Sequence, residues 1–413
     1  MKDEKLMILS MLEEGKITSE EAIKLLDALE ETESFIEYES TEDNEVKFIN
    51  IDKTKEKLEG LEKNIKDQNK KVESLGIDLG GKLANTFSNL FSTGNPFNLL
   101  GNYKVLNTKV EKDISYMDSP TIHLKSINGS INLKSWEKEK LLIKIIYQYK
   151  HNNFTEDDKF YDLYEENNKI IFEPIYANNV MMNLDVYLPD RYYKEINLDT
   201  SNGKIQAESL NLKILNCDTT NASISLKDII GKNIDLTTKN GRINLINISS
   251  PILKAVSTNS NIILEDIDSD NLIVSTKNGR IKLSNILGKD ISANTSNSSI
   301  EINNISSKII KLATSNGKII CWDLDNKKIS ELKLSTSNST IDVEIGELNK
   351  MSYFHLETSL GNIDLDLPDL VYKVNRQVNL GMKKIVAHSA NFDEKEEHFV
   401  LDASTSNGSI KIR

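Results

Sequence analysis

The residues of this chain that most readily do chemistry are its histidines and cysteines. The five histidines have no metal-ligand spacing with each other or with the two cysteines. No HExxH, GxSxG, Walker or dinucleotide-binding motif occurs. Cys217 and Cys321 each occupy an apolar position of a repeat, which predicts two small core residues without a disulfide. The sequence therefore predicts no metal, no cofactor and no catalytic residue. The histidines are His123, His151, His355, His388 and His398.

Three aspartates have a spacing that could build an enzyme site, because β-solenoids can be polysaccharide lyases or hydrolases. Asp228, Asp266 and Asp323 recur at one position of the repeat and could share a face. Carbohydrate clefts usually expose aromatic rings, yet residues 200–345 contain a single one, Trp322. We therefore predict that the chain is not an enzyme, with a carbohydrate-active β-helix enzyme as the alternative. The same repeat position elsewhere holds asparagine, at Asn247, Asn285 and Asn304.

A row of cations is the most patterned surface feature of the sequence. Four turns that contain glycine are each followed by a basic residue, whereas the turns between them are followed by small polar residues. This row is a candidate binding surface, and the alternative is that it only keeps one edge of the fold soluble. The row consists of Lys204, Arg242, Arg280 and Lys318.

The same turns carry an asparagine at almost every repeat. Asparagine tolerates left-handed backbone geometry and can hydrogen-bond a neighbouring turn. We therefore predict a structural ladder of asparagines along one edge. Its members are Asn202, Asn221, Asn240, Asn259, Asn278, Asn297, Asn316, Asn338 and Asn407.

These turns belong to a 19-residue repeat, read most easily from the isoleucine that follows each turn. Intervals of 22 lead on to Ile341 and Ile363, Ile410 closes the chain, and an earlier copy, SINGSI, ends at Ile131. A fixed period over seven consecutive units indicates a repeat architecture. Glycine alternates with alanine or serine after the asparagine, so one coil holds either 19 or 38 residues. The isoleucines at 19-residue intervals are Ile205, Ile224, Ile243, Ile262, Ile281, Ile300 and Ile319.

Each repeat contains two strands in which every second residue is apolar. The first strand has the form I-x-L-x-[DN]-I, as in 243–248, and the second leads to a threonine, as in 234–238. This alternation buries one face of each strand, and the turn threonines share the buried parity. Stacked repeats would align the aliphatic side chains, each contributing about 1.5–3 kcal/mol when fully buried. The predicted fold class is mainly β, a parallel β-solenoid of two-strand repeats over residues 105–413.

Two segments interrupt the repeat. Residues 141–150 are a long apolar strand followed by further strand patterns, which we expect to cover the N-terminal end of the solenoid. Residues 367–399 are also irregular, and we expect them to cap the other end before TSNGSIKI supplies a final rung.

The first quarter of the chain has a helical pattern. Residues 1–31 predict a small helical hairpin that must pack on a partner or self-associate, because it is too short to be stable alone. Residues 32–50 are interpreted as an acidic linker, and 51–76 as an amphipathic helix that forms a coiled coil or lies along its own domain. The Gly-rich segment 77–104 contains an amphipathic face that either contacts a membrane surface or caps the solenoid.

Charge limits the classes of partner. Residues 1–50 carry 15 acidic and 5 basic residues, a local charge of −10, so the remaining chain has −12 − (−10) = −2. Without a concentrated basic face, nucleic-acid binding is not expected. The N-terminus lacks a signal-peptide core and no run of 18 apolar residues exists. We therefore expect a cytoplasmic protein, with association with the membrane or the envelope left open.

Several motifs together resemble a known family. The segments SINGSI, SWEKEKLLIK, LDVYLP, the TSNG turns and a terminal TSNGSIKI resemble the bacterial adhesin-type family of β-strand-repeat domains, a domain of unknown function. EEGKITSEEAIKLLDAL is similar to the SHOCT-like helical hairpin that precedes this domain in some members. The asparagine-rich turns replace the aspartates of many relatives, which argues against calcium-dependent behaviour.

The resemblance implies a bacterial protein without an assigned catalytic residue. Some relatives belong to cell-envelope stress systems, so the hairpin would mediate self-association or contact a protein partner, and the solenoid would be a recognition surface. Our hypothesis is a non-catalytic scaffold or binding protein with an unknown ligand. The alternatives are the carbohydrate-active enzyme and a peripheral membrane-associated, adhesin-like protein.

Overall fold

The computed structural model describes residues 103–413, apart from 151–153, 155–157, 347, 349 and 378–380. The elements predicted for 1–31, 32–50, 51–76 and most of 77–104 lie outside the described residues. The described part is built of strands, from β1 (Tyr103–Asp113) to β26 (Ile410–Ile412). None of its residues form a helix long and apolar enough to cross a bilayer.

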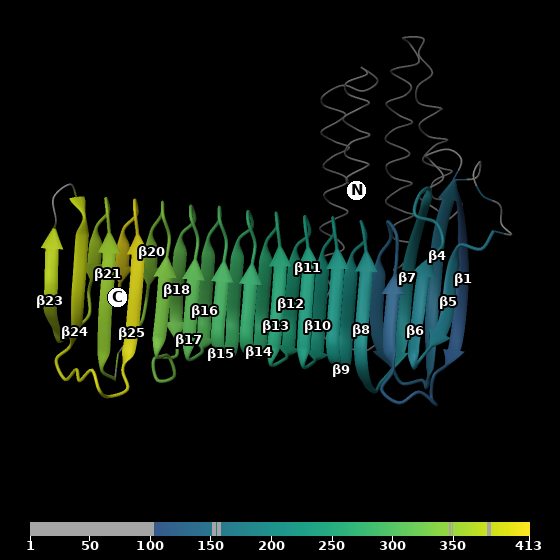
Figure 1. Ribbon diagram of the computed structural model, residues 1–413, viewed down its shortest axis with the longest axis horizontal. Coiled ribbons are helices and arrows are strands. Elements are labelled where there is room, and N and C mark those ends of the chain that lie inside the picture. Colours follow the sequence, from purple (N-terminus) through teal and green to yellow (C-terminus); the bar gives the residue numbers. More distant parts are fainter. Residues whose placement is uncertain (1–102, 151–153, 155–157, 347, 349, 378–380) are drawn as a thin grey trace, which may run out of the picture. The chain divides into compact units, whose positions relative to one another are not determined.

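The central repeats stack as coils of two strands each (Figure 1). Ile224 pairs in register with Ile205 of the preceding repeat and with Ile243 of the next. Each coil between Ile205 and Ile319 therefore holds 19 residues, the next one holds 22 because Ile319 pairs with Ile341, and the 38-residue coil is excluded. The central strands are β8 (Tyr192–Thr200), β9 (Ile205–Thr219), β10 (Ile224–Ile230), β11 (Asn233–Thr238), β12 (Ile243–Ser249), β13 (Ile252–Ser257), β14 (Ile262–Ser275), β15 (Ile281–Asn294), β16 (Ile300–Ser306), β17 (Ile309–Ala313), β18 (Ile319–Leu324), β19 (Glu331–Ser335) and β20 (Ile341–Val343).

The strand pairings define two parallel layers. The first strands of successive repeats pair with one another, as β10 does with β12, and the second strands do likewise, as β11 does with β13. The long strands β9, β14 and β15 contribute to both layers, since their two halves pair with different partners. The mainly β, solenoid-like fold expected from the two-residue alternation is confirmed.

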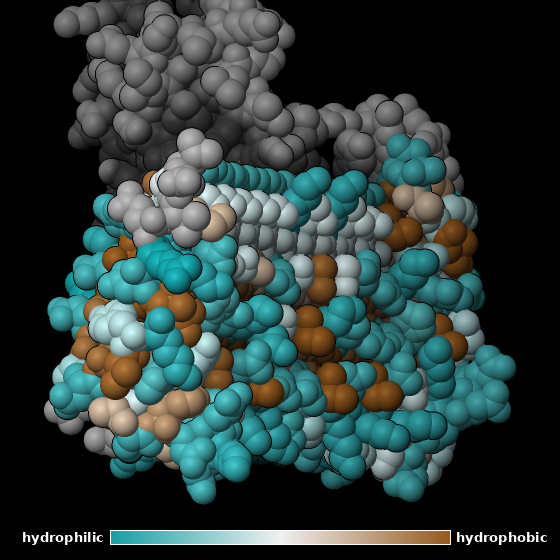
Figure 2. Space-filling view, turned by 60° about the vertical axis from the view of Figure 1, so that its left-hand side comes forward, coloured by the Kyte–Doolittle hydropathy of each residue, from teal (hydrophilic) through white to brown (hydrophobic). Residues whose placement is uncertain are grey.

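The core lies between the two layers. In the central repeats the isoleucine after each turn is completely buried, whereas Ile363 near the C-terminal end is half-buried. Strand β11 alternates buried and half-buried residues along its length. Cys217 and Cys321 are buried within this core and are free thiols. Figure 2 shows a mostly polar surface with separate apolar patches. The exposed apolar residues of the central coils include Ile252, Ile273 and Leu287.

At the N-terminal end, the order of strands in space differs from their order in the chain. The rung of β2 (Thr121–Lys125) and β3 (Ile131–Trp136) lies between the rung of β6 and β7 and the rung of β8 and β9. Additional strands extend this end, as residues 141–150 and the strand patterns after them predict, and they pair antiparallel with one another. The additional strands are β1, β4 (Lys140–Lys150), β5 (Tyr161–Glu166), β6 (Lys169–Pro174) and β7 (Val180–Pro189).

The C-terminal end repeats this arrangement. The rung of β25 and β26, predicted to close the array, instead pairs with β19 and β20 on one side and with β21 and β22 on the other. The antiparallel strands β24 and β23 lie beyond β21. At both ends a rung displaced from chain order is thus paired on two sides, so it presents no free strand edge. These strands are β21 (Ser352–Thr358), β22 (Ile363–Leu365), β23 (Leu370–Gln377), β24 (Lys383–Ser389), β25 (Phe399–Thr405) and β26.

Candidate functional site: the turn edge

Each coil turns back through four residues, and the stacked turns form what we call the turn edge. It comprises residues 201–204, 220–223, 239–242, 258–261, 277–280, 296–299, 315–318 and 337–340. Along the upper margin of Figure 2, the stacked rungs form a regular row. The opposite connection, from the first strand of a coil to the second, forms the bulge edge, which comprises residues 228–232 and their equivalents in the other coils.

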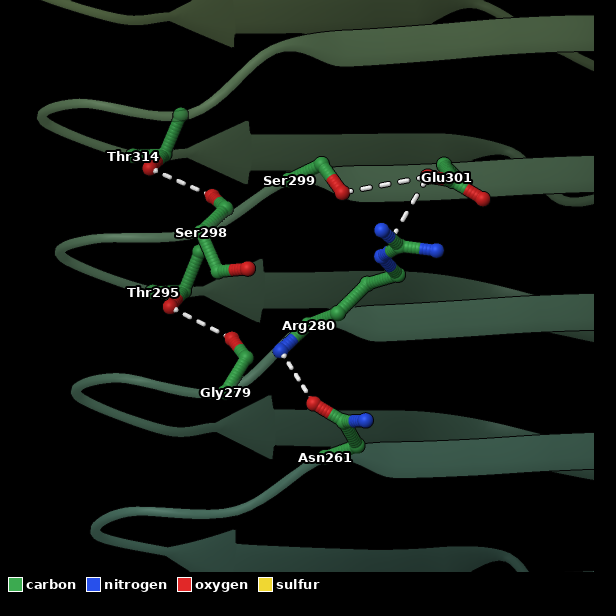
Figure 3. A network of polar contacts seen from close by, with 8 residues as sticks. All are labelled: Asn261, Gly279, Arg280, Thr295, Ser298, Ser299, Glu301 and Thr314. Atoms are coloured by element: carbon green, nitrogen blue, oxygen red, sulfur yellow. Dashed lines mark hydrogen bonds and ion pairs between the residues drawn. The ribbon is translucent and has the colours of Figure 1, made fainter.

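A buried threonine or serine holds each turn on its neighbour. The hydroxyl of Thr295 donates a hydrogen bond to the carbonyl oxygen of Gly279 at 3.0 Å, and Thr314 does the same to Ser298 at 3.0 Å (Figure 3). These carbonyls belong to the turn of the preceding coil, so the inward-facing threonines fix the spacing between turns. The other donors in this column are Thr200, Thr219, Thr238, Ser257, Thr276, Thr336, Thr358 and Thr405.

Close approach of neighbouring backbones explains the recurring glycine. A Cβ on Gly279 would lie 1.9 Å from the carbonyl oxygen of Ser260, and one on Gly241 would lie 1.6 Å from that of Ala222. Neither glycine has a left-handed backbone, so the requirement is for space rather than for conformational freedom. A turn with alanine or serine at this position can therefore precede a glycine turn in the stack. The glycine itself cannot be replaced by a residue with a side chain.

The nine predicted asparagines lie in one column and bond to one another. In each rung the side-chain Nδ2 donates to the Oδ1 of the preceding rung, as Asn278 does to Asn259 at 2.7 Å. The ladder bridges the change in chain order, since Asn407 donates to Asn338 at 2.6 Å. It also includes Asn128, which accepts from Asn202 at 2.5 Å. The isolated SINGSI copy was the signal in the sequence for this tenth member. The remaining bonds join Asn221, Asn240, Asn297 and Asn316.

The four cations of the predicted row are exposed and lie in one column, on alternate rungs. Because neighbouring strands are about 4.8 Å apart, successive cations repeat about every 9.6 Å. The structure adds Lys239 and Lys277, which stand three residues before Arg242 and Arg280 in the same turns and are also exposed. The repeated sequence TKNGR carries this signal, which our prediction missed.

Arg280 shows how this edge is held in place (Figure 3). Its backbone N–H donates to the side-chain oxygen of Asn261 at 2.9 Å, and its Nε lies 3.6 Å from a carboxylate oxygen of Glu301. Ser299 also donates to Glu301 at 3.1 Å. Glu301 belongs to the adjoining strand β16, and the turn residues themselves include no carboxylate.

The charge of the turn edge is therefore one-sided. Its eight turns contain six lysines or arginines and no aspartate or glutamate. The spacing of the cations is comparable to the Debye length of about 8 Å at physiological ionic strength, so their fields overlap only partly. Such an edge attracts a partner of opposite charge in a salt-dependent way.

The aspartates considered for catalysis lie on the bulge edge. Asp228, Asp266 and Asp323 all have a left-handed backbone, with φ between 54° and 55°. The residues on either side of each aspartate pair in unbroken register with the neighbouring coil, whereas the aspartate itself is unpaired, so each lies at a local bend that recurs from coil to coil. Asn285 Nδ2 donates to Asp266 Oδ1 at 2.9 Å, and Asn247 donates to Asp228 at 2.6 Å. Backbone geometry thus accounts for aspartate and asparagine at this position.

Burial also explains why the two cysteine thiols are not reactive groups. Burial raises the pKa of the Cys217 and Cys321 thiols far above the usual range, and nearby aspartates add to this shift. Such thiols are neither good nucleophiles nor ready metal ligands. Within residues 103–413, gaps aside, no three histidine, cysteine, aspartate or glutamate side chains gather as a metal site.

Comparison with known proteins identifies two regions of the chain. A SHOCT-like domain matches residues 3–34, and the Toastrack DUF4097 family matches residues 121–268 and 252–413. The sequence motifs predicted that both regions are similar to known families, and these matches confirm that prediction.

Two individual proteins are also similar. The uncharacterized protein YvlB of Bacillus subtilis is 26% identical over 235 residues, which are 53% of this chain and 58% of that protein. The crystal structure of a candidate cell adhesion protein from Clostridium sporogenes aligns with 74% of this chain and 99% of that one, at 10% identity and a TM-score of 0.21. The chain thus spans little more than half the length of its curated relative.

Proposed function

Because the chain belongs to the Toastrack DUF4097 family, we propose that it is a non-catalytic binding scaffold whose turn edge docks an acidic partner protein. The observation that carries this proposal is the charge of the turn edge, with six exposed cations and no carboxylate in eight stacked turns. Hydrogen-bonded threonines and asparagines hold these turns in a fixed array. The cations are therefore presented with little conformational entropy left to lose in the backbone when a partner binds.

The non-catalytic part of the proposal is supported by the state of the aspartates. An acid or base catalyst needs a carboxylate free to reach the substrate. Asp228 and Asp266 instead accept hydrogen bonds from neighbouring asparagines, at positions where the backbone is left-handed. This arrangement favours a scaffold over a carbohydrate-active enzyme.

Binding to poly-L-glutamate, a simple acidic polypeptide, tests the turn edge. We expect the dissociation constant measured by calorimetry to rise about tenfold or more between 50 and 200 mM salt, because ion pairing at an exposed surface is screened. Replacing Lys204, Arg242, Arg280 and Lys318 by glutamine should weaken binding at 50 mM salt by at least tenfold.

A control of equal charge is available on the opposite edge. Lys213, Lys232, Lys289 and Lys308 are exposed there, and glutamine at all four should change the affinity by less than twofold. Equal losses in the two variants would show that only net charge matters. Binding to anionic vesicles without binding to poly-L-glutamate would assign the edge to a membrane surface instead.

The N-terminal region would bring several such edges together. We propose that the SHOCT-like segment, matched over residues 3–34, mediates self-association or contact with a protein partner, in the setting of cell-envelope stress. Sedimentation of the full chain and of a chain lacking residues 1–31 tests this proposal. A concentration-dependent mass in the full chain that disappears on truncation supports it, and identical monomeric masses contradict it.

A further inference from the structure

A second surface feature lies on the outer face of the first-strand layer, near its N-terminal end. A hollow of about 400 Å³ opens between β7, β3, β9 and β10. Its volume falls within the roughly 300–1,000 Å³ that is typical of small-molecule sites. Two parallel rows of side chains line it, the first being Asp185, Asn132, Gln206 and Ser225 and the second Tyr187, Lys134, Glu208 and Lys227.

The first row contains a polar atom without a partner. Asn132 Nδ2 donates to Asp185 Oδ1 at 2.7 Å, but the Oδ1 of Asn132 is buried and accepts no hydrogen bond among the described residues. Buried polar atoms in folded proteins are nearly always paired. The oxygen is covered where it stands, so a donor from outside the chain reaches it only when the Asn132 side chain turns outward into the hollow.

The charges of the hollow cancel. Glu208 in the second row lies 3.0 Å from the amine of Lys134 and 3.6 Å from that of Lys227. With Asp185, the lining contains two acidic and two basic side chains. A ligand with a strong charge of either sign is thus not favoured, and this distinguishes the hollow from the turn edge.

The end of the hollow is aromatic. The ring of Tyr187 lies beside that of Trp136, with centroids 5.5 Å apart, and the amine of Lys144 lies 5.0 Å from the centre of the Tyr187 ring. A half-buried ring next to planar amide and carboxylate groups offers one apolar face and several hydrogen-bonding groups. A pyranose ring has the matching chemistry, with C–H groups on one face and hydroxyls around its rim.

We propose that this hollow is a binding site for a neutral saccharide. On binding, the Asn132 side chain turns toward the hollow and its Oδ1 accepts from a sugar hydroxyl. Neighbouring hydroxyls bond to Asp185, Gln206 and Ser225, and an apolar sugar face rests against Tyr187. The site is independent of the turn edge. Loss of one would leave the other intact.

Saturation-transfer NMR and calorimetry on the full chain test the proposal, with chitotetraose, cellotetraose and maltotetraose as probes. We expect at least one probe to bind. Asn132→Ala and Tyr187→Ala should each weaken that binding by at least tenfold, while binding of poly-L-glutamate stays unchanged. Asn244→Ala is the matched control, because Asn244 holds the equivalent position on β12, beyond the hollow, and should change affinity by less than twofold.

A variant that cannot disturb the core keeps the test decisive. Gln206 is exposed, so Gln206→Ala leaves the fold unchanged and should weaken binding about threefold. Failure of all three probes to bind, or an affinity that Asn132→Ala and Gln206→Ala leave within twofold of the natural chain, would overturn the assignment.

Discussion

The two edges of the solenoid solve the same stacking problem with different chemistry. At the turn edge, buried threonines bond to the carbonyls of the preceding turn and asparagines bond to one another. At the bulge edge, a left-handed residue recurs in each coil and asparagine pairs with aspartate. The turn edge needs hydroxyls, amides and glycines, so its other positions can be cationic. The bulge edge has aspartate or asparagine at its left-handed position in six coils and serine, Ser209, in one, so carboxylates accumulate there for structural reasons.

The largest difference between the edges should appear when a methyl group is added to a glycine. In Gly279→Ala the new Cβ would lie 1.9 Å from the backbone oxygen of Ser260, and a backbone atom cannot move aside without disturbing the turn. We expect a loss of about 3 kcal/mol in the free energy of unfolding, measured by urea denaturation. Gly231→Ala at the bulge edge places its Cβ 3.2 Å from side-chain atoms of Ile234, which can adjust. A similar loss in both variants would refute the steric account.

This contrast also shows how far the sequence could lead. The two strands of each repeat and the buried parity of the threonines follow from alternation with period 2, because a one-residue slip would expose every aliphatic side chain. The sequence left the coil at 19 or 38 residues, and only the pairing of Ile224 with Ile205 and Ile243 decides it. The reason for glycine at alternate turns could not be predicted, since it depends on distances between backbones of different coils. The same holds for the position of β25 and β26, because sequence proximity does not indicate which rung a returning strand joins.

The two candidate sites also differ in how far the sequence could predict them. The cation row was readable from its spacing, and TKNGR could have added Lys239 and Lys277. The saccharide hollow could not be predicted from the sequence, because the strands that line it are distant in the chain and do not follow chain order in space. The unpaired oxygen of Asn132 is visible only once β3 and β7 are adjacent.

A hydroxyl deletion at the turn edge is expected to have the next largest effect. Thr295→Val keeps the shape and β-branching of the side chain but leaves the Gly279 carbonyl without its donor. The expected cost is about 2 kcal/mol, the usual penalty for an unpaired buried group. Thr237→Val is the control, because Thr237 lies on the half-buried outer side of β11. If the two substitutions lower the melting temperature equally in thermal unfolding, the hydroxyl of Thr295 does not stabilise the turn.

Substitutions at Asp266 test whether this aspartate is present for its backbone conformation or for catalysis. Valine at a left-handed position should cost about 1–2 kcal/mol, whereas Asp266→Asn, the residue that other repeats use here, should leave the melting temperature within a degree or two. Glu265→Val provides the control on the adjoining strand position, where a β-branched residue is favoured. A carbohydrate-degrading activity abolished by Asp266→Asn would reverse the conclusion that this aspartate is structural.

The smallest effect is expected from the asparagine ladder, where position along the ladder sets the magnitude. Asn259→Ala removes two amide hydrogen bonds, one to Asn240 and one from Asn278. Asn407→Ala removes one, because the next rung places Leu360 at this position. With exposed bonds near the low end of roughly 0.5–1.5 kcal/mol each, we expect losses of about 1 and about 0.5 kcal/mol. Equal losses in paired urea titrations would mean that each asparagine acts within its own turn, and the rows of amides would then be a by-product of stacking rather than a contribution to it.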